Sequence, residues 1–295
     1  MQDRQFHRQE VQAFLHEHLG GTGWELTLPH GWGHETYYAR SSTQACFIKL
    51  GAQIPRYQAM AGLGLTPEVV AAGRMGDGTS ILVQAYVDGR TPTRRDYRTH
   101  LEQFVAAIRA VHRSPQVRQV LPTASCDTYR EIGLETLAGI QHRWQRYRPL
   151  VPQVAEFVDE ALAQLARQAA DFQGAGLVAS HNDICNANWL ITPEGRLYLI
   201  DLDSMALEDP ALDTGATLWW YYPPALRHRF LELCGYPDDD AFQQRMRVRM
   251  AMHCLHILLP RQHSFDRFDP AGFPQALVDF RAALAGEENP QGYED

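Results

Sequence analysis

The sequence predicts an α+β protein with two lobes, a small N-terminal lobe rich in β-strands and a larger C-terminal lobe that is mainly helical. Short apolar runs separated by Gly or Ser turns fill the first third of the chain, which is typical of strands. From about Asp96 onward, apolar residues instead recur at spacings of three and four, the period of an amphipathic helix. The pattern changes near Gly89 and Pro92, which interrupt regular elements. We therefore divide the chain into residues 1–88 and 89–295.

The N-terminal lobe is expected to begin with a short helix and to continue with four strands. The strands are predicted at Trp24–Leu28, Thr36–Arg40, Ala45–Leu50 and Ile81–Val87. One helix is expected between them, over Pro55–Leu65, because Pro67 then ends the helical pattern.

The C-terminal lobe contains three stretches in which apolar residues line one face of a helix. The residues of these faces are Leu101, Phe104, Val105, Ile108 and Val111 in the first stretch, Val158, Leu162, Leu165, Ala169 and Phe172 in the second, and Phe242, Met246, Met250, His253 and Ile257 in the third. The three stretches predict long helices.

Composition and charge narrow the class of protein. Hydrophobic residues make up 45% and charged residues 21% of the 295 residues, which is ordinary for a soluble globular protein. The first ten residues are polar and no apolar run reaches the length of a membrane helix, so we expect a cytoplasmic protein that uses no membrane. The formal charge of −8 argues against nucleic-acid binding and is compatible with a cationic substrate. The oligomeric state stays open.

Neither cysteines nor histidines indicate a structural metal site or a disulfide framework. The five cysteines form no Cys-x-x-Cys pair. The thirteen histidines include no HExxH motif, although two of them, His253 and His256, are three residues apart on a predicted helix. We therefore expect no dedicated zinc site.

Residues 177–213 carry the densest chemical signal of the chain. A short apolar strand leads into the polar loop Ser180–Asn188, which contains Asp183. Two further strands, Trp189–Thr192 and Leu197–Ile200, follow as a hairpin. Asn188 precedes the hairpin and Asp201 follows it, so the hairpin is expected to bring their side-chain oxygens together.

These three residues match the needs of phosphoryl transfer. One carboxylate must orient or deprotonate the attacking hydroxyl, and Asp183 is placed for that task. Hard oxygen ligands must hold Mg²⁺ against the phosphates, and Asn188 and Asp201 supply one neutral and one charged oxygen.

The order and spacing of these residues resemble a known family. His181-x-Asp183-x4-Asn188, the strand into Asp201 and the segment Asp209-Pro-Ala-Leu-Asp213 are similar to the H-x-D-x4-N, I-D and D-P-x-x-D motifs of the aminoglycoside phosphotransferase and choline kinase family. The resemblance implies a protein-kinase-like fold. It also implies transfer of the γ-phosphate of ATP or GTP, with Mg²⁺, to a hydroxyl of an aminoglycoside-, choline-, thiamine- or sugar-like molecule. In that family the last Asp of the third motif, here Asp213, supports the catalytic region, and we expect His181 to brace the loop.

The nucleotide-binding parts of such a kinase are expected in the first lobe. Lys49 is the only lysine of the chain and lies on a predicted strand, where related kinases carry the lysine that contacts the α- and β-phosphates. Gly31 and Gly33 lie in a loop ahead of it that would cover the phosphates. Gln84 and Tyr86 lie in the segment that resembles the connector between the lobes, which pairs with adenine.

The acceptor molecule is expected near Asp183 in the C-terminal lobe. Asp203 occupies a position where related enzymes often carry a second acid, so it is a candidate for binding metal or a cationic substrate. Trp219 and Trp220 belong to a run of four aromatic residues that could enclose a cation. Adjacent helical residues face different directions, so at least two of the four are expected in the core.

One departure from the family motivates an alternative function. The family usually provides a Glu on the small-lobe helix to pair with the strand lysine, whereas no Asp or Glu lies between Leu50 and Pro67. Either a Gln substitutes, another acid reaches Lys49, or the nucleotide site is weakened. The third case would favour a non-catalytic, nucleotide-binding pseudokinase with a regulatory role. A metal-dependent hydrolase is a further alternative, which lacks recognisable metal-ligand spacing.

Overall fold

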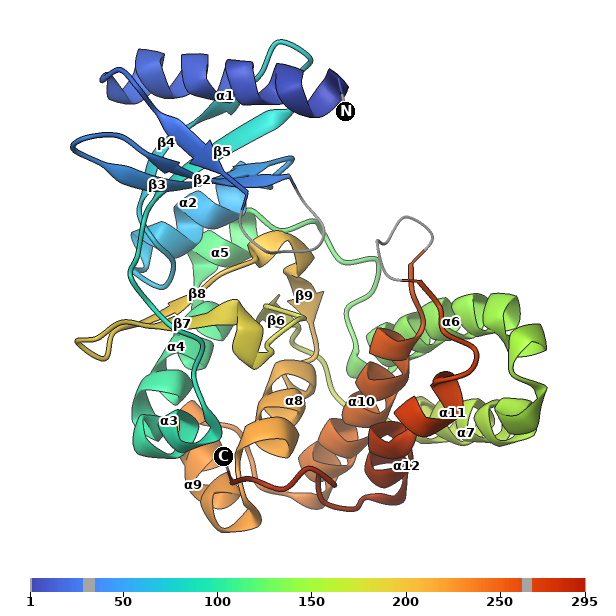
Figure 1. Ribbon diagram of the computed structural model, residues 1–295. Helices are drawn as coiled ribbons and strands as arrows, with labels where there is room; N and C mark the ends of the chain where they lie inside the picture. Colours follow the sequence, from blue (N-terminus) through green and yellow to red (C-terminus); the bar gives the residue numbers. More distant parts are fainter. Residues whose placement is uncertain (1, 29–34, 262–266, 295) are drawn as a thin grey trace. The chain divides into compact units, whose positions relative to one another are not determined.

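The computed structural model describes residues 2–28, 35–261 and 267–294 (Figure 1). The chain forms two compact units, one of residues 1–91 with 189–203 and the other of residues 92–188 with 204–295. The first unit contains a five-stranded sheet and the second is mainly helical, so the predicted α+β class is confirmed. The boundary at residues 88–89 follows from the change of sequence pattern near Gly89 and Pro92, and as a division into functional lobes it stays a prediction.

The first unit is built on an antiparallel sheet with the strand order β1-β2-β3-β5-β4. Its strands are β1 (Glu25–Thr27), β2 (Thr36–Arg40), β3 (Ala45–Leu50), β4 (Val69–Arg74) and β5 (Ser80–Ala85). The sequence pattern predicts four of these and misses β4, whose Ala71, Ala72 and Gly73 have low strand propensity. A Cβ atom on Gly73 would lie 2.9 Å from the ring of Phe14, so this strand needs a small residue beneath the N-terminal helix.

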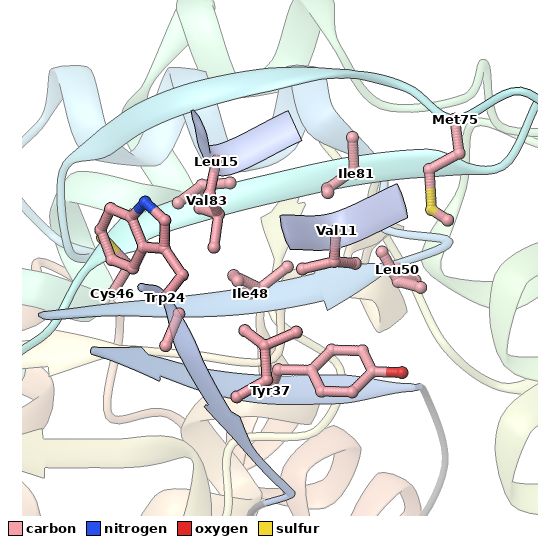
Figure 2. Packing of buried hydrophobic residues seen from close by; sticks show 12 residues of the cluster. Val11, Leu15, Trp24, Tyr37, Cys46, Ile48, Leu50, Met75, Ile81 and Val83 are labelled. Carbon is pink, nitrogen blue, oxygen red and sulfur yellow. The ribbon is translucent and has the colours of Figure 1, made fainter. Parts of the chain in front are cut away.

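That helix, α1 (Gln2–Leu19), covers one face of the sheet (Figure 1). Val11 and Leu15 of α1 pack in a core cluster with Ile48, Leu50 and Val83 of the sheet, and each of the five is buried (Figure 2). Burial of such aliphatic side chains contributes roughly 1.5–3 kcal/mol each, so this layer fixes β3 at the centre of the unit.

The opposite face of the sheet is contacted by α2 (Ile54–Gly62), which begins with Pro55 in its first turn (Figure 1). Successive side chains of a strand point to opposite faces. Lys49 lies between Ile48 and Leu50, which face α1, and its side chain therefore points toward α2. The alternation of side chains along β3 therefore places the charged side chain of Lys49 beneath α2.

A short hairpin completes the first unit. It consists of β7 (Trp189–Ile191) and β8 (Leu197–Leu199), which pair antiparallel. The N–H of Ile191 donates to the carbonyl of Arg90 at 2.8 Å, and the Arg90 N–H donates back to Ile191 at 3.0 Å. The N–H of Leu199 donates to the carbonyl of Leu65 at 2.7 Å. These bonds hold the hairpin, and the residues that follow β8, against the rest of the unit.

The second unit consists of ten α-helices, short 3-10 helices and one pair of strands among its described residues. The helices are α3 (Arg94–Thr99), α4 (Leu101–Arg113), α5 (Pro115–Gln119), α6 (Tyr129–Tyr147), α7 (Pro152–Ala170), α8 (Ala211–Tyr221), α9 (Pro224–Cys234), α10 (Asp240–Leu258), α11 (Phe273–Ala276) and α12 (Val278–Ala285), and the paired strands are β6 (Val178–Ser180) and β9 (Ala206–Glu208). Helix α10 packs against α6, α7, α8 and α12, which places it at the centre of the bundle.

The three helical stretches predicted from periodicity correspond to α4, α7 and α10. All five predicted face residues of α4 are buried, whereas Ile257 near the end of α10 is 52% exposed. Capping boxes at Thr93 and Thr128 begin α3 and α6 by satisfying the free N–H groups of their first turns. Over the described residues, no helix combines the length and apolar character needed to cross a membrane.

Candidate active site

The backbone at the start of the loop that follows β6 is held by the carboxylate of Asp213. Asp213, in the first turn of α8, accepts hydrogen bonds from the backbone N–H groups of His181 at 2.7 Å and Asn182 at 3.0 Å. His112 of α4 lies 3.3 Å from the same carboxylate. Asn182 takes a left-handed backbone conformation, with φ of 64°, which Asn tolerates better than most residues. These contacts of Asp213 fix the backbone immediately before Asp183.

The environment of Asp213 stabilises its charged form. Complete burial alone would raise the pKa of this carboxyl. The hydrogen bond and charge of His112, together with His181, outweigh burial and lower the pKa to about 2. Asp213 is therefore an ionised, buried anchor for the loop at neutral pH.

Asp183 and Asn188, which begin and end the second half of the loop, contact each other. The amide nitrogen of Asn188 donates to the backbone carbonyl of Asp183 at 2.7 Å and to its carboxylate Oδ2 at 3.0 Å. Because both bonds use the amide nitrogen, the amide oxygen of Asn188 stays available as an acceptor or metal ligand. The same contacts orient the Asp183 carboxylate and leave its Oδ1 for another partner.

In the first unit, Lys49 of β3 lies between two carboxylates. Its Nζ is 2.5 Å from Oδ1 of Asp201 and 2.5 Å from Oδ2 of Asp203. The lysine side chain is 6% exposed, that of Asp203 13% and that of Asp201 48%. An acid absent from α2 therefore reaches Lys49 from the segment after β8, which was one of the open alternatives.

Tyr57 of α2 also contacts Lys49. Its hydroxyl lies 3.1 Å from the Lys49 Nζ, accepts the backbone N–H of Leu202 at 3.1 Å and donates to Oδ2 of Asp203 at 3.1 Å. The sequence pattern does not point to Tyr57, because a phenol hydroxyl, and not a carboxylate or amide, provides the acceptor here. Arg56, on the same helix, donates to the backbone carbonyl of Asp203.

Charges within this cluster keep Lys49 protonated. Burial opposes the charge of the lysine, but the Tyr57 oxygen and the carboxylates of Asp201 and Asp203 outweigh it, so the Lys49 pKa is raised. Burial raises the pKa of Tyr57 as well, so its hydroxyl keeps its proton at neutral pH. The cluster is a buried cation surrounded by oxygen atoms.

Asp201 has an unusual backbone, with φ of 56° in the left-handed region. This conformation is uncommon for residues other than Gly, and Asp is among those that adopt it more readily. Lys49 contacts Oδ1, which leaves Oδ2 of this half-exposed carboxylate available to a cation. Strained residues of this kind often lie at functional sites.

The remaining candidates for nucleotide binding have different surroundings. Gln84 is 3% exposed and donates to the carbonyl of Pro67 at 2.8 Å, so its side chain serves the turn before β4. The Tyr86 ring is 45% exposed, and its N–H donates to the carbonyl of Ala45. The assignment of Gln84 and Tyr86 to nucleotide binding stays a prediction. Gly31 and Gly33 lie outside the described residues.

The aromatic run at the end of α8 is largely committed to packing. Trp219 is 8% exposed, and its indole N–H donates to the carbonyl of Glu287 at 3.1 Å. Its ring meets Trp220 edge-on, with centroids 4.8 Å apart. Tyr221 stacks on Tyr97 at 4.1 Å and accepts the N–H of Asn186 at 2.7 Å. A cation cage at Trp219 and Trp220 stays a prediction that this packing does not favour.

Within the described ranges, no group of three His, Cys, Asp or Glu residues is arranged to hold a metal ion. A metal ion bound within these ranges would therefore be held by at most two of these side chains. Mg²⁺ commonly binds to one or two carboxylates and completes its shell with water and phosphate oxygens.

Comparison with known proteins bears on the family and the fold of the chain. A sequence model described as the phosphotransferase enzyme family matches residues 26–244. Among solved structures, choline kinase LicA from Streptococcus pneumoniae is 15% identical, with a TM-score of 0.69 over 95% of this chain and 99% of that one.

Two further structures have the same fold. A choline/ethanolamine kinase family protein from Mesorhizobium loti is 17% identical, with a TM-score of 0.66 over 94% of this chain and 98% of that one. The GDP complex of wild-type aminoglycoside 2′-phosphotransferase-IIIa is 12% identical, with a TM-score of 0.67 over 94% and 98%. The predicted family and protein-kinase-like fold are confirmed. The chain therefore belongs to the phosphotransferase enzyme family and is an enzyme of the small-molecule kinase type.

Proposed function

We propose that the chain transfers the γ-phosphoryl group of ATP or GTP to a hydroxyl group of a small molecule, with Mg²⁺. The observation that carries the proposal is the Lys49 cluster, in which the only lysine of the chain is buried, charged and held by two carboxylates and a phenol. Nucleotides occur in structures of the same fold, namely AMP in a LicA complex, ADP in a spectinomycin phosphotransferase complex and GDP in an aminoglycoside phosphotransferase.

Lys49 is the proposed ligand of the nucleotide α- and β-phosphates. An ammonium group offers three donors, and in the free protein two of its partners are carboxylates. A phosphate oxygen would take the place of the half-exposed Asp201 on Lys49, while Tyr57 and the more buried Asp203 keep the lysine in position. Tyr57 and Asp203 thus perform the positioning that a helical Glu performs elsewhere in the family.

The residues proposed to hold Mg²⁺ are Asn188 and Asp201. They fit this ion because the free side-chain oxygens left by their contacts, the Asn188 amide oxygen and Asp201 Oδ2, are hard ligands. The bound ion would neutralise charge on the β- and γ-phosphates.

Asp183 is the proposed base for the acceptor. The acceptor oxygen forms a bond to the γ-phosphorus while the bond from that phosphorus to the β–γ bridging oxygen breaks, and the hydroxyl proton passes to Asp183. Asn188 fixes Oδ2 of Asp183, which leaves Oδ1 to accept this proton. Asp213 acts through the backbone of residues 181 and 182, and is a positioning residue.

The test compares wild type with Asp183→Asn in a coupled assay of ADP release with MgATP. Amino alcohols, aminoglycosides, macrolides and sugars serve as acceptors. We expect turnover to fall by about 10²- to 10⁴-fold while the KM for nucleotide changes little, because the amide keeps the shape of Asp183 but is a poor base. Asp171→Asn, at an exposed acid after α7, is the matched control and should retain wild-type rates.

Equal activity of wild type and Asp183→Asn would exclude Asp183 as the base. Calorimetric binding of nucleotide without turnover by any acceptor would favour the pseudokinase alternative. The reason for that alternative was the lack of a partner for Lys49, and the contacts with Asp203 and Tyr57 remove it.

A further inference from the structure

A cavity of about 460 Å³ lies in the second unit, lined mainly by α6 and α10. Asn182, which precedes Asp183 in the chain, and Ser204 belong to its lining. The Oδ1 of Asn182 is buried and has no hydrogen-bond partner among the described residues, so the cavity presents an unused acceptor beside the proposed base. A hydroxyl group of a bound molecule would satisfy it.

The charges that line this cavity are unbalanced in favour of cations. Three arginines, Arg143, Arg249 and Arg261, face two acids, Glu135 and Glu208, which gives a net charge of +3 − 2 = +1 with histidines neutral. Glu208 pairs with Arg249 at 2.7 Å and is therefore neutralised. Glu135 is exposed and accepts the hydroxyl of Ser125 at 2.5 Å.

The remaining pair, Arg143 and Arg261, forms no ion pair with a carboxylate in the described part of the chain. Arg143 donates instead to the backbone carbonyl of Leu259 at 2.7 Å, and its Nη2 lies 2.7 Å from Nδ1 of His256. Arg261 approaches the other ring nitrogen of His256, with Nη2 to Nε2 at 3.3 Å. One imidazole thus separates two guanidinium groups.

This arrangement leaves hydrogen-bond donors without acceptors. Burial, reinforced by Arg143 and Arg261, lowers the pKa of His256 to about 3, so the ring is neutral at neutral pH. A neutral imidazole has one acceptor nitrogen and one N–H, and a guanidinium has donors only. If Nδ1 accepts from Arg143, Nε2 carries the proton and points at the donors of Arg261. The two N–H groups then face each other, and an oxyanion would accept from both.

Arg249 adds a second unused donor. Its side chain is completely buried, and its Nε has no hydrogen-bond partner in the described ranges, while Nη1 donates to the Thr136 hydroxyl at 3.1 Å. No Phe, Tyr or Trp side chain lines the cavity within those ranges, so the cation–π contacts of these rings, which hold quaternary amines, are not provided there.

We propose that this cavity binds the acceptor, and that the acceptor is an anionic hydroxyl compound whose carboxylate or phosphate group is bound by Arg261, His256 and Arg143 while a hydroxyl lies near Asn182 and Asp183. The proposal rests on the proposed phosphoryl transfer for the fate of the hydroxyl, but the anion site rests on the arginines alone. It differs from the expectation of a cationic substrate, which came from the net charge of the whole chain, from Asp203 and from the aromatic run that contains Trp219 and Trp220, and not from the lining of a cavity.

A set of four sugars on one ring frame tests the charge preference. Glucuronate carries a carboxylate, glucose 6-phosphate a phosphate, glucose no charge and glucosamine a cation. Binding of each sugar, and of inorganic phosphate, is measured by calorimetry at constant ionic strength with wild type, Arg261→Gln and Arg167→Gln. Arg261 is exposed, so its replacement should not prevent folding, and Arg167 is an exposed arginine of α7 that does not line the cavity.

We expect inorganic phosphate and at least one of the two anionic sugars to bind wild type. Their affinity should fall by about 10- to 100-fold in Arg261→Gln and stay unchanged in Arg167→Gln, the usual effect of losing a charge-assisted hydrogen bond. The preference between glucuronate and glucose 6-phosphate distinguishes a carboxylate from a phosphate. In the ADP-release assay, Arg261→Gln should raise the KM for the anionic acceptor and leave the KM for nucleotide unchanged.

Three results would overturn the anion site: no binding of phosphate or either anionic sugar to wild type, equal binding by wild type and Arg261→Gln, or tightest binding of glucosamine. Dependence on Arg261 separates this site from any phosphate bound at Lys49. Anion binding that depends on Arg261, with no turnover of these sugars or of any acceptor in the wider panel, would reject the proposed phosphoryl transfer and leave the anion site standing.

Discussion

Replacement of Tyr57 by Phe removes one hydroxyl from a point where three groups of the first unit meet. The ring stays, so packing beneath the sheet is preserved, and the loss is confined to the contacts with Lys49, Leu202 and Asp203. The backbone N–H of Leu202 is buried and loses its acceptor, which costs about 1–3 kcal/mol. Lys49 keeps both carboxylates, so its charge stays compensated.

We therefore expect Tyr57→Phe to lower the free energy of unfolding by about 1–3 kcal/mol and the Tm by roughly 2–10 °C. The lysine loses the contact that fixes it from α2, so the KM for nucleotide should rise by about tenfold, which corresponds to roughly 1.4 kcal/mol. Urea unfolding and ADP release with varied MgATP measure the two effects.

The matched control is Tyr38→Phe, which removes the hydroxyl of a ring that is 42% exposed on β2. It should leave both quantities unchanged. Wild-type stability and wild-type nucleotide KM in Tyr57→Phe would refute the assignment of Tyr57 as the group that replaces the helical acid.

Three other perturbations test the remaining parts of the site. Lys49→Met should raise the KM for nucleotide at least about tenfold. It also leaves Asp201 and Asp203 without a cation, so the free energy of unfolding measured with urea should fall by about 1–3 kcal/mol. An unchanged KM would argue against phosphate binding by Lys49. Asp213→Asn presents an amide N–H₂ to one of the two loop N–H groups. We therefore expect the free energy of unfolding to fall by about 1–3 kcal/mol, and turnover to decrease with an unchanged nucleotide KM. Full activity would show that the loop does not depend on the bonds to Asp213. The pKa of His256 is lowered to about 3 in the folded protein, whereas an unperturbed histidine has a pKa of about 6.5. Between these two pH values the folded protein binds fewer protons than the unfolded chain. The contribution of His256 to stability is therefore full above this pH range, and stability falls by up to about 1.4 kcal/mol per pH unit as the pH decreases through it. Urea unfolding from pH 7.5 to pH 5 should show a shallower decline in His256→Gln, and identical slopes would contradict this.

The fold could be predicted from the sequence where side-chain patterning alone determines an element. The face of α4 from Leu101 to Val111 repeats at helical spacing and is buried as expected. β4 could not be found in this way, because the residues at its centre are small. The strand forms because small residues let Phe14 of α1 approach closely, and Phe14 lies far away in the sequence.

The same distinction applies to the site. Asp183 and Asn188 are five residues apart in one loop, so their spacing in the sequence was informative, and the structure brings their side chains together. The role of Tyr57 could not be predicted, because a hydroxyl in place of a carboxylate leaves no charge pattern in the sequence. The Arg143–His256–Arg261 group comes from two helices and the segment after α10, and its meaning depends on donors and acceptors that only the folded chain brings together.

The position of Lys49 allows the opening of the sheet in the first unit to be measured by proteolysis. A protease that cuts after lysine has a single cleavage site, the bond between residues 49 and 50. That bond lies in β3, which is paired on both sides by β2 and β5. Proteases need an extended, unpaired segment, so cleavage requires the sheet of the first unit to come apart, whatever happens in the helical unit. The rate at which two fragments appear on a gel would therefore measure the opening of that sheet alone, without a label or an engineered site.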